Sequence, residues 1–312
     1  MTSGQDDVAF LRALAAYIHT NHHPLKLYLS GHSNGGMMTN RMWCETGNQV
    51  FDAFIAFDGP ASGLYNPNPQ AGDSEKSLQC SVPLEGTSIA PPFLSVLALK
   101  DSVVGNTPEK NMDKTLWTIP GPTYFLASYA YSRRILLNDW FAHEQLRAPI
   151  ACGQFPSRAQ FYTRSNMKLW SACGGRVGVL AFAEPVANCS KFAAGHCISY
   201  LQVGLGAGLL DFALEWARTD GATSKYLPAA HDNKAGVSKP SLADLEITGY
   251  PHKIDLFVPS STPLYGMVFL HGGGGTKDGV EISLGLTVEW AEEHRVVVAV
   301  PQGQSLQTCC EY

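Results

Sequence analysis

Residues 25–38 read LKLYLSGHSNGGMM, an apolar, β-prone run that passes through a glycine-flanked serine into a helix-prone segment. Its central part is a G-x-S-x-G sequence at a strand-to-helix turn, the arrangement called a nucleophile elbow. A serine hydroxyl reaches a carbonyl only if the turn lifts it clear of the sheet, and such a sharp turn excludes bulky neighbours. Gly31 and Gly35 therefore predict Ser33 as a nucleophile, with a purely structural glycine turn as the weaker alternative.

The composition is typical of a folded, water-soluble enzyme. Of 312 residues, 45% are hydrophobic and 16% are charged, which argues against disorder. The net charge is −5 with no basic cluster, so we expect no nucleic-acid partner, and no apolar run is long enough for a membrane span. The opening residues MTSGQDD have neither the basic nor the apolar region of a signal peptide.

Eight cysteines without C-x-x-C pairs favour disulfides and an oxidising compartment over a zinc site. We expect Cys44 to pair with Cys309 or Cys310, because Cys44 lies about three helical turns after Ser33 and the other two lie in the loop that leads into the neighbouring helix. Cys173 and Cys189 flank one predicted strand and form a second expected pair.

Periodicity predicts alternating strands and helices along the chain. Strands are expected at 25–30, 51–57, 93–99, 176–182, 245–247, 254–258, 264–270 and 296–300, and helices at 6–20, after Ser33, at 131–145, 209–216 and 282–294. Residues 219–241 are polar and aperiodic, which indicates a linker or surface loop. The alternation predicts an α/β fold with a mostly parallel central sheet and helices on both faces.

A serine nucleophile of this kind needs an acid after a later strand and then a histidine. Asp101 follows the strand that ends at Leu99, where a carboxylate can accept the imidazole Nδ1–H and fix the tautomer. Asp58 also follows a strand and is the rival acid, although that strand comes directly after the elbow helix. His196 follows the last strand before the closing helix and is the expected base.

The segment HGGGG at residues 271–275 follows an apolar strand and is typical of an oxyanion loop. Glycine backbone can approach a tetrahedral intermediate closely enough to donate N–H bonds to its negative oxygen, and the N–H of Asn34 should be the second donor. A phosphate-binding loop is less favoured, because no Gly-Lys-Ser/Thr follows.

The order of these motifs is unusual, because an oxyanion loop normally precedes the elbow. Reading residues 245–312 first and 1–218 second restores the order of oxyanion strand, elbow, acid and histidine. The sequence therefore predicts a circularly permuted α/β-hydrolase fold. We expect one catalytic domain over 1–312, with 1–218 carrying the elbow, acid and histidine, 219–241 a linker, and 242–312 the permuted first strands.

Several motifs resemble the polyhydroxybutyrate depolymerase and feruloyl esterase-like family of secreted esterases: GHSNGGM at 31–37, LHGGGG at 270–275, VPQG at 300–303 and DDVAF at 6–10. The resemblance implies a triad of Ser33, Asp101 and His196, with Asn34 and Gly273 as oxyanion donors. It also implies carboxylic-ester substrates, no cofactor and secretion; we further expect no metal and a monomer. The chain departs from the family at 195–199, where many members carry Trp-Pro soon after the histidine.

These features predict a serine esterase that forms an acyl-enzyme on Ser33. The first expected substrate class is a polyester of the polyhydroxybutyrate type. Feruloyl or acetyl esters of plant polysaccharides are the alternative, because the departure at 195–199 affects the substrate more than the triad. A catalytically silent binding protein of the same fold is a further alternative, although such proteins usually lose a triad member.

Overall fold

The computed structural model describes residues 6–59, 91–98, 160–164, 167–182, 206–222, 239–273, 275–278 and 288–303, and the structural statements below concern these residues. The helices are α1 (Asp7–His22), α2 (Asn34–Thr46), α5 (Gly206–Arg218) and α7 (Val288–His294), with a short 3-10 helix, η1, at Cys173–Gly175. The strands are β1 (Lys26–His32), β2 (Ala53–Phe57), β3 (Phe93–Ala98), β4 (Gln160–Arg164), β5 (Met167–Ala172), β6 (Val177–Phe182), β7 (Leu242–Glu246), β8 (Lys253–Phe257), β9 (Tyr265–Leu270) and β10 (Val296–Pro301).

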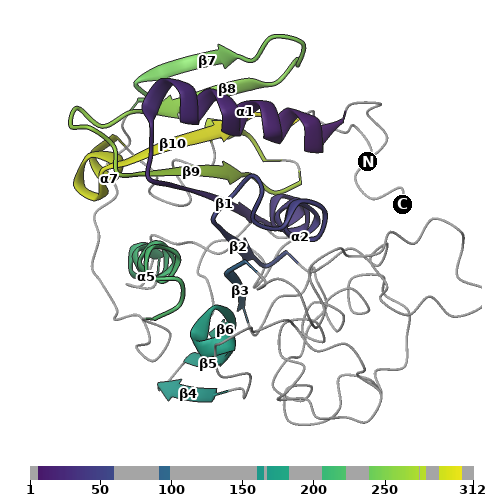
Figure 1. Cartoon of the computed structure of the whole chain (residues 1–312), viewed down its shortest axis with the longest axis vertical. Coiled ribbons are helices and arrows are strands. Elements are labelled where there is room, and N and C mark those ends of the chain that lie inside the picture. The colour runs from purple at the N-terminus through teal and green to yellow at the C-terminus, as the bar shows by residue number, and fades with distance from the viewer. Residues whose placement is uncertain are drawn as a thin grey trace, which may run out of the picture.

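The strands of the described residues form one mixed sheet in the order β4-β5-β6-β3-β2-β1-β9-β10-β8-β7 (Figure 1). All neighbouring pairs between β6 and β10 are parallel. The two strands at each edge pair antiparallel, β4 and β5 at one side and β8 and β7 at the other. The molecule thus has an α/β fold with a parallel centre, as the alternation of elements predicted.

Strand β1 lies in the interior of the sheet between β2 and β9. In the pairing of β1 with β9, Lys26 lies opposite Tyr265 and Gly31 lies opposite Leu270. The expectation that the strand ending at Leu270 shares a sheet with the strand before Ser33 is confirmed. Strands from 242–301 and strands from 26–182 therefore contribute to a single sheet.

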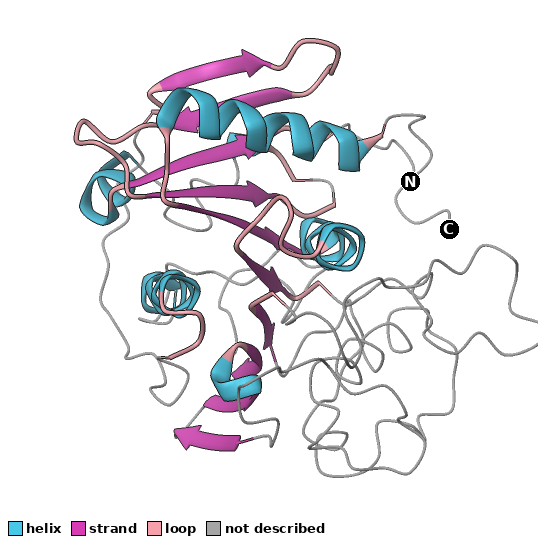
Figure 2. Ribbon diagram, viewed as in Figure 1, coloured by secondary structure: helices cyan, strands magenta, loops and turns pink. Residues whose placement is uncertain are grey.

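The two faces of the sheet carry separate hydrophobic clusters, because successive strand residues point to opposite sides. Leu27 and Leu29 of β1 pack in the cluster that includes residues of α1 and α2. Tyr28 belongs to the opposite cluster, with residues of α5 and α7. Figure 2 shows these helices lying on the two sides of the strands, as the sequence predicted.

Helix α1 has clear local start and stop signals. The Asp6 side chain accepts a hydrogen bond from the Ala9 N–H at 3.0 Å, which caps the first turn. The helix ends at His22, because His23 adopts a left-handed conformation with φ of 49°. Its buried stripe includes Leu11, Leu14 and Ile18, the face expected from the sequence.

The start of α1 and the end of β10 lie against the same histidine. His252 is 6% exposed, and its Nδ1 lies 3.1 Å from the carbonyl oxygen of Gln302. Its Nε2 lies 3.9 Å from Oδ1 of Asp7, and its ring packs 4.2 Å from that of Phe10. The first described helix and the last described strand are therefore neighbours in space. The prediction that Met1 and Tyr312 lie close together falls outside the described residues.

Some expected elements differ from those observed or fall outside the described residues. Strands β4 and β5 were not predicted, and they form the antiparallel edge beyond β6. Strand β7 spans Leu242–Glu246 rather than 245–247. The expected helix at 131–145 lies outside the described residues. Of the helix expected at 282–294, the described part is α7, which spans Val288–His294.

Candidate active site

Ser33 occupies the turn between β1 and α2, where the backbone has φ of 54° and ψ of −119°. Positive φ is strained for a residue with a Cβ, and such strain persists only where the surroundings enforce it. Here the Ser33 N–H donates to the Phe57 carbonyl at 2.9 Å, and the Ser33 carbonyl accepts from Met37 N–H at 2.8 Å. The turn is therefore the sharp strand-to-helix turn that the sequence predicted.

The glycines of the elbow allow three close backbone approaches. A Cβ on Gly31 would lie 2.5 Å from the carbonyl carbon of Gly35. A Cβ on Gly35 would lie 2.2 Å from the carbonyl oxygen of Leu270, and one on Gly36 would lie 2.7 Å from Cα of Gly59. Each neighbour is backbone that cannot swing aside, so these positions require glycine. The expected steric reason for the G-x-S-x-G spacing is confirmed.

The glycine loop after β9 lies directly against the elbow. A Cβ on Gly272 would lie 3.1 Å from Cβ of Ser33, and one on Gly273 would lie 2.6 Å from Nδ2 of Asn34. The elbow and the glycine loop, which are far apart in the sequence, thus meet at the residues that the sequence analysis predicted to form the site. The structure brings together Ser33, Asn34 and Gly273.

His271 fixes the direction of the peptide that joins Gly272 to Gly273. Its Nδ1 lies 2.8 Å from the Gly272 carbonyl oxygen, which also accepts from the Gly275 N–H at 3.0 Å. Because the C=O and N–H of a trans peptide point in opposite directions, the Gly273 N–H faces away from His271. The Gly273 N–H, next to Asn34, therefore points away from the hydrogen bonds that the Gly272 carbonyl oxygen accepts from His271 and Gly275.

The hydrogen bonds of His271 also define its tautomer. Its Nε2 accepts the Gly303 N–H at 2.8 Å, so the ring proton resides on Nδ1 and is donated to Gly272. Burial lowers the pKa of His271, and the backbone hydrogen bond to Gly272 opposes this effect only in part. The neutral ring therefore ties the glycine loop to the end of β10.

The rival acid Asp58 lies at the end of β2, fully buried and with φ of 42°. Its N–H donates to the Val96 carbonyl of β3 at 2.8 Å. The next residue, Gly59, accepts a hydrogen bond from the Asn40 side chain at 2.8 Å, which ties this turn to α2. Asp58 thus follows β2, the strand beside β1, whereas the strand that precedes Asp101 in the sequence, β3, lies next to β2 on the side away from β1.

The predicted acid Asp101 and base His196 lie outside the described residues, as do Cys189, Cys309 and Cys310. Cys173 forms a disulfide, which agrees with the expectation that this cysteine is paired. The described residues contain no group of three or more His, Cys, Asp or Glu side chains that could hold a metal ion.

Sequence reasoning did not assign the residues that anchor the glycine loop. His271 was noted only as part of the HGGGG segment, and Gln302 only as part of the VPQG segment. The buried Asp255 and its partner Lys277 were not singled out. Their partners are distant in sequence, so no local pattern could reveal them.

Within the described part of the chain, no helix is both long and apolar enough to cross a membrane. Comparison with known proteins found no matching family model, no matching curated protein and no matching solved structure.

Proposed function

We propose that this chain is a serine esterase with an α/β-hydrolase fold in circularly permuted order. The observation that carries the proposal is the contact between the glycine loop at Gly272–Gly273 and the elbow at Ser33–Asn34. Two peptide N–H groups beside a serine on a strained turn are the features needed to hold the oxyanion of an acyl-transfer reaction.

The permuted order is supported by the order of the strands in the sheet and by contacts between the first and last described segments of the chain. In rejoined order, the strands start with the antiparallel pair β7 and β8, continue with β9 and β10, and then reach β1. Across the sheet these strands lie as β7, β8, β10, β9 and β1, so their order in space differs from the rejoined chain order only by the exchange of β9 and β10. His252 contacts both Asp7 and Gln302, so the two segments that rejoining would connect are adjacent.

In the proposed reaction, Ser33 Oγ attacks the ester carbonyl while His196 takes the hydroxyl proton and Asp101 orients the imidazole. The N–H groups of Asn34 and Gly273 bind the oxyanion. When the intermediate collapses, the bond to the alcohol oxygen breaks and His196 returns the proton to that oxygen. Water then attacks the acyl-enzyme by the same route, which releases the carboxylic acid and regenerates Ser33.

We propose a polyester of the polyhydroxybutyrate type as the first substrate class and feruloyl or acetyl esters of plant polysaccharides as the second. Secretion is part of the same proposal, and the disulfide at Cys173 supports it because disulfides persist in oxidising compartments. A panel of polymer films, methyl ferulate and short p-nitrophenyl esters would rank these substrates.

The central test is reaction of the purified protein with a fluorophosphonate, followed by peptide mapping, together with turnover of p-nitrophenyl butyrate. Label on Ser33 and loss of both label and turnover in Ser33→Ala are the expected results. Ser260→Ala is the matched control, because Ser260 is an exposed serine before the start of β9, at the edge of the parallel sheet opposite to the turn that follows β1. Full turnover in Ser33→Ala would refute the proposal.

A further inference from the structure

The glycine loop is held at both ends by the residues that follow β10. At its start, His271 Nε2 accepts the Gly303 N–H at 2.8 Å. At its end, the Lys277 N–H donates to Oε1 of Gln302 at 2.9 Å. The Gln302 side-chain amide also donates to the Gly303 carbonyl at 3.0 Å. These bonds bind the loop as a unit to one short backbone segment.

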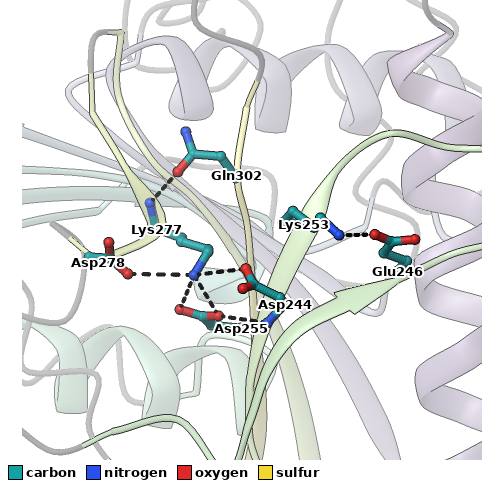
Figure 3. A network of polar contacts seen from close by, with 7 residues as sticks. All are labelled: Asp244, Glu246, Lys253, Asp255, Lys277, Asp278 and Gln302. Carbon is teal, nitrogen blue, oxygen red and sulfur yellow. Dashed lines mark hydrogen bonds and ion pairs between the residues drawn. The ribbon is translucent and has the colours of Figure 1, made fainter.

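The Lys277 side chain adds an anchor on the next strand of the sheet. Its Nζ lies 2.8 and 2.9 Å from the two carboxylate oxygens of Asp255 in β8 (Figure 3). Asp255 is 1% exposed and also accepts the Asp244 N–H at 3.2 Å. A carboxylate this buried requires a charged partner, so the end of the loop is tied to β8. Asp244 and Asp278, both largely exposed, lie 3.4 and 3.5 Å from the same ammonium.

The ion pair of Lys277 and Asp255 is better explained by the position that it gives the loop than by a contribution to the free energy of unfolding. Removing two charges from water costs about as much as their attraction returns, so a buried ion pair contributes little net stability. A buried ion pair does, however, fix the relative position of the two segments that it joins, here the end of the glycine loop and β8. The nearby pair of Lys253 and Glu246 provides a contrast, because both side chains are exposed and pair with each other across one hairpin (Figure 3).

We propose that Lys277, Asp255 and Gln302 are positioning residues that hold the Gly273 N–H at the oxyanion on Ser33. This inference rests on the proposed function. The three residues lie outside the elbow and act through the loop that spans 271–278. Loosening them displaces one oxyanion donor while Ser33 and the opposite donor at Asn34 stay in place. The rate constant kcat therefore falls while KM changes little, because the lost interaction forms only in the transition state.

The test separates positioning from stability with a paired substitution. Lys277→Met leaves Asp255 buried without its partner and should lower both the Tm and kcat. Adding Asp255→Asn removes the unpaired charge and keeps an oxygen for the Asp244 N–H, so the Tm should recover. In this double variant kcat per fluorophosphonate-titrated site should stay about tenfold below that of the unmodified protein. Lys253→Met is the matched control and should leave kcat unchanged.

A second readout is amide hydrogen exchange, which needs no turnover. Peptides covering 271–278 should exchange faster in the double variant, while peptides covering the elbow at 31–38 should keep their rates. Normal kcat or unchanged exchange of the loop in the double variant overturns this inference alone. Failure of Ser33 in the unmodified protein to react with the fluorophosphonate overturns the proposed function and this inference together.

Discussion

Leu270 lies opposite Gly31 in neighbouring parallel strands, although the two residues come from opposite ends of the chain. The carboxyl ends of parallel strands meet at the same edge of a sheet, which is where α/β folds place their sites. The turn to Ser33 and the loop to Gly273 therefore begin side by side. A Cβ on Gly35 would meet the Leu270 carbonyl oxygen at 2.2 Å, so the contact also depends on a glycine in the helix.

The choice of acid can be tested by comparing two aspartates. Asp101→Asn should lower kcat by about 10³ to 10⁴ fold, because the asparagine favours the wrong tautomer of the histidine. Asp58→Asn should mainly lower the Tm, since Asp58 is fully buried within the turn after β2. Turnover of p-nitrophenyl butyrate per titrated site measures the difference. The opposite ranking of kcat would assign the acid to Asp58.

Gly35→Ala should destabilise the protein by about 3 kcal/mol or more, although alanine is the better helix former. The added Cβ meets the backbone oxygen of Leu270, so β9 or α2 must shift. Gly266→Ala is the control, since its Cβ meets the flexible end of the Leu27 side chain at 2.6 Å. That change should cost about 1 kcal/mol in urea unfolding. Equal losses in the two variants would contradict the tight contact at Gly35.

The free energy of unfolding should decrease as the pH falls below about 6.5. Burial lowers the pKa of His271 in the folded state, so the unfolded chain takes up a proton first. Burial and the neighbouring His23 lower the pKa of His22 in the same direction. Stability is therefore retained above the unfolded pKa and lost between that value and the lower folded pKa. Urea titrations from pH 7 to 5 measure this slope.

His271→Gln should make that slope shallower, and adding His22→Gln should reduce it further. Glutamine keeps an oxygen that can accept the Gly303 N–H but does not titrate. An identical slope in His271→Gln and the unmodified protein would show that His271 titrates alike in the folded and unfolded states.

Tyr28→Phe should stabilise the protein by about 1 kcal/mol at neutral pH. Tyr28 is fully buried, and among the described residues its hydroxyl has no hydrogen-bond partner. Burial raises the pKa of Tyr28 well above its ordinary value, so the unfolded chain releases this proton first as the pH rises above about 10. The stabilisation by Tyr28→Phe should therefore increase above pH 10. Loss of stability in the variant would instead indicate a partner for the hydroxyl.

The parts of the fold that the sequence predicted are those with strong local signals. Strands β1, β9 and β10 are continuous apolar runs, because they are buried on both faces of a parallel sheet. The elbow could also be recognised, because its sharp turn requires glycines at fixed spacing around Ser33. Strands β4 and β5 lie at an edge and mix polar with apolar residues, as in QFYTR and MKLWSA, so no clear period marks them.

The anchors of the glycine loop could not be predicted in the same way. Asp255 interrupts an apolar strand, and a charge at such a position usually indicates a solvent-facing side chain. Its partner Lys277 follows the next strand along the chain, and Gln302 follows the strand after that. Their meeting depends on the order of β9, β10 and β8 in the sheet, which is a property of the tertiary fold.

The proposed permuted order predicts that the chain can be rejoined and opened elsewhere. Joining Tyr312 to Met1 with a short flexible linker and opening the chain within 223–236 should give a folded, active esterase. The segment 219–241 is polar and carries none of the proposed catalytic residues. The opening belongs after Ala222, because Gly221 has φ of 85°, and its N–H donates to the Trp216 carbonyl at 2.8 Å.

The matched control carries the same linker but is opened between Phe54 and Ile55. That opening cuts β2, a fully buried strand that pairs with both β1 and β3, so this variant should not fold. Circular dichroism, Tm and turnover of p-nitrophenyl butyrate compare the two proteins. The contacts of His252 with Asp7 and with Gln302 place the described segments on the two sides of the join next to each other. An unfolded product from the opening within 223–236, with the linker in place, would count against the permuted order.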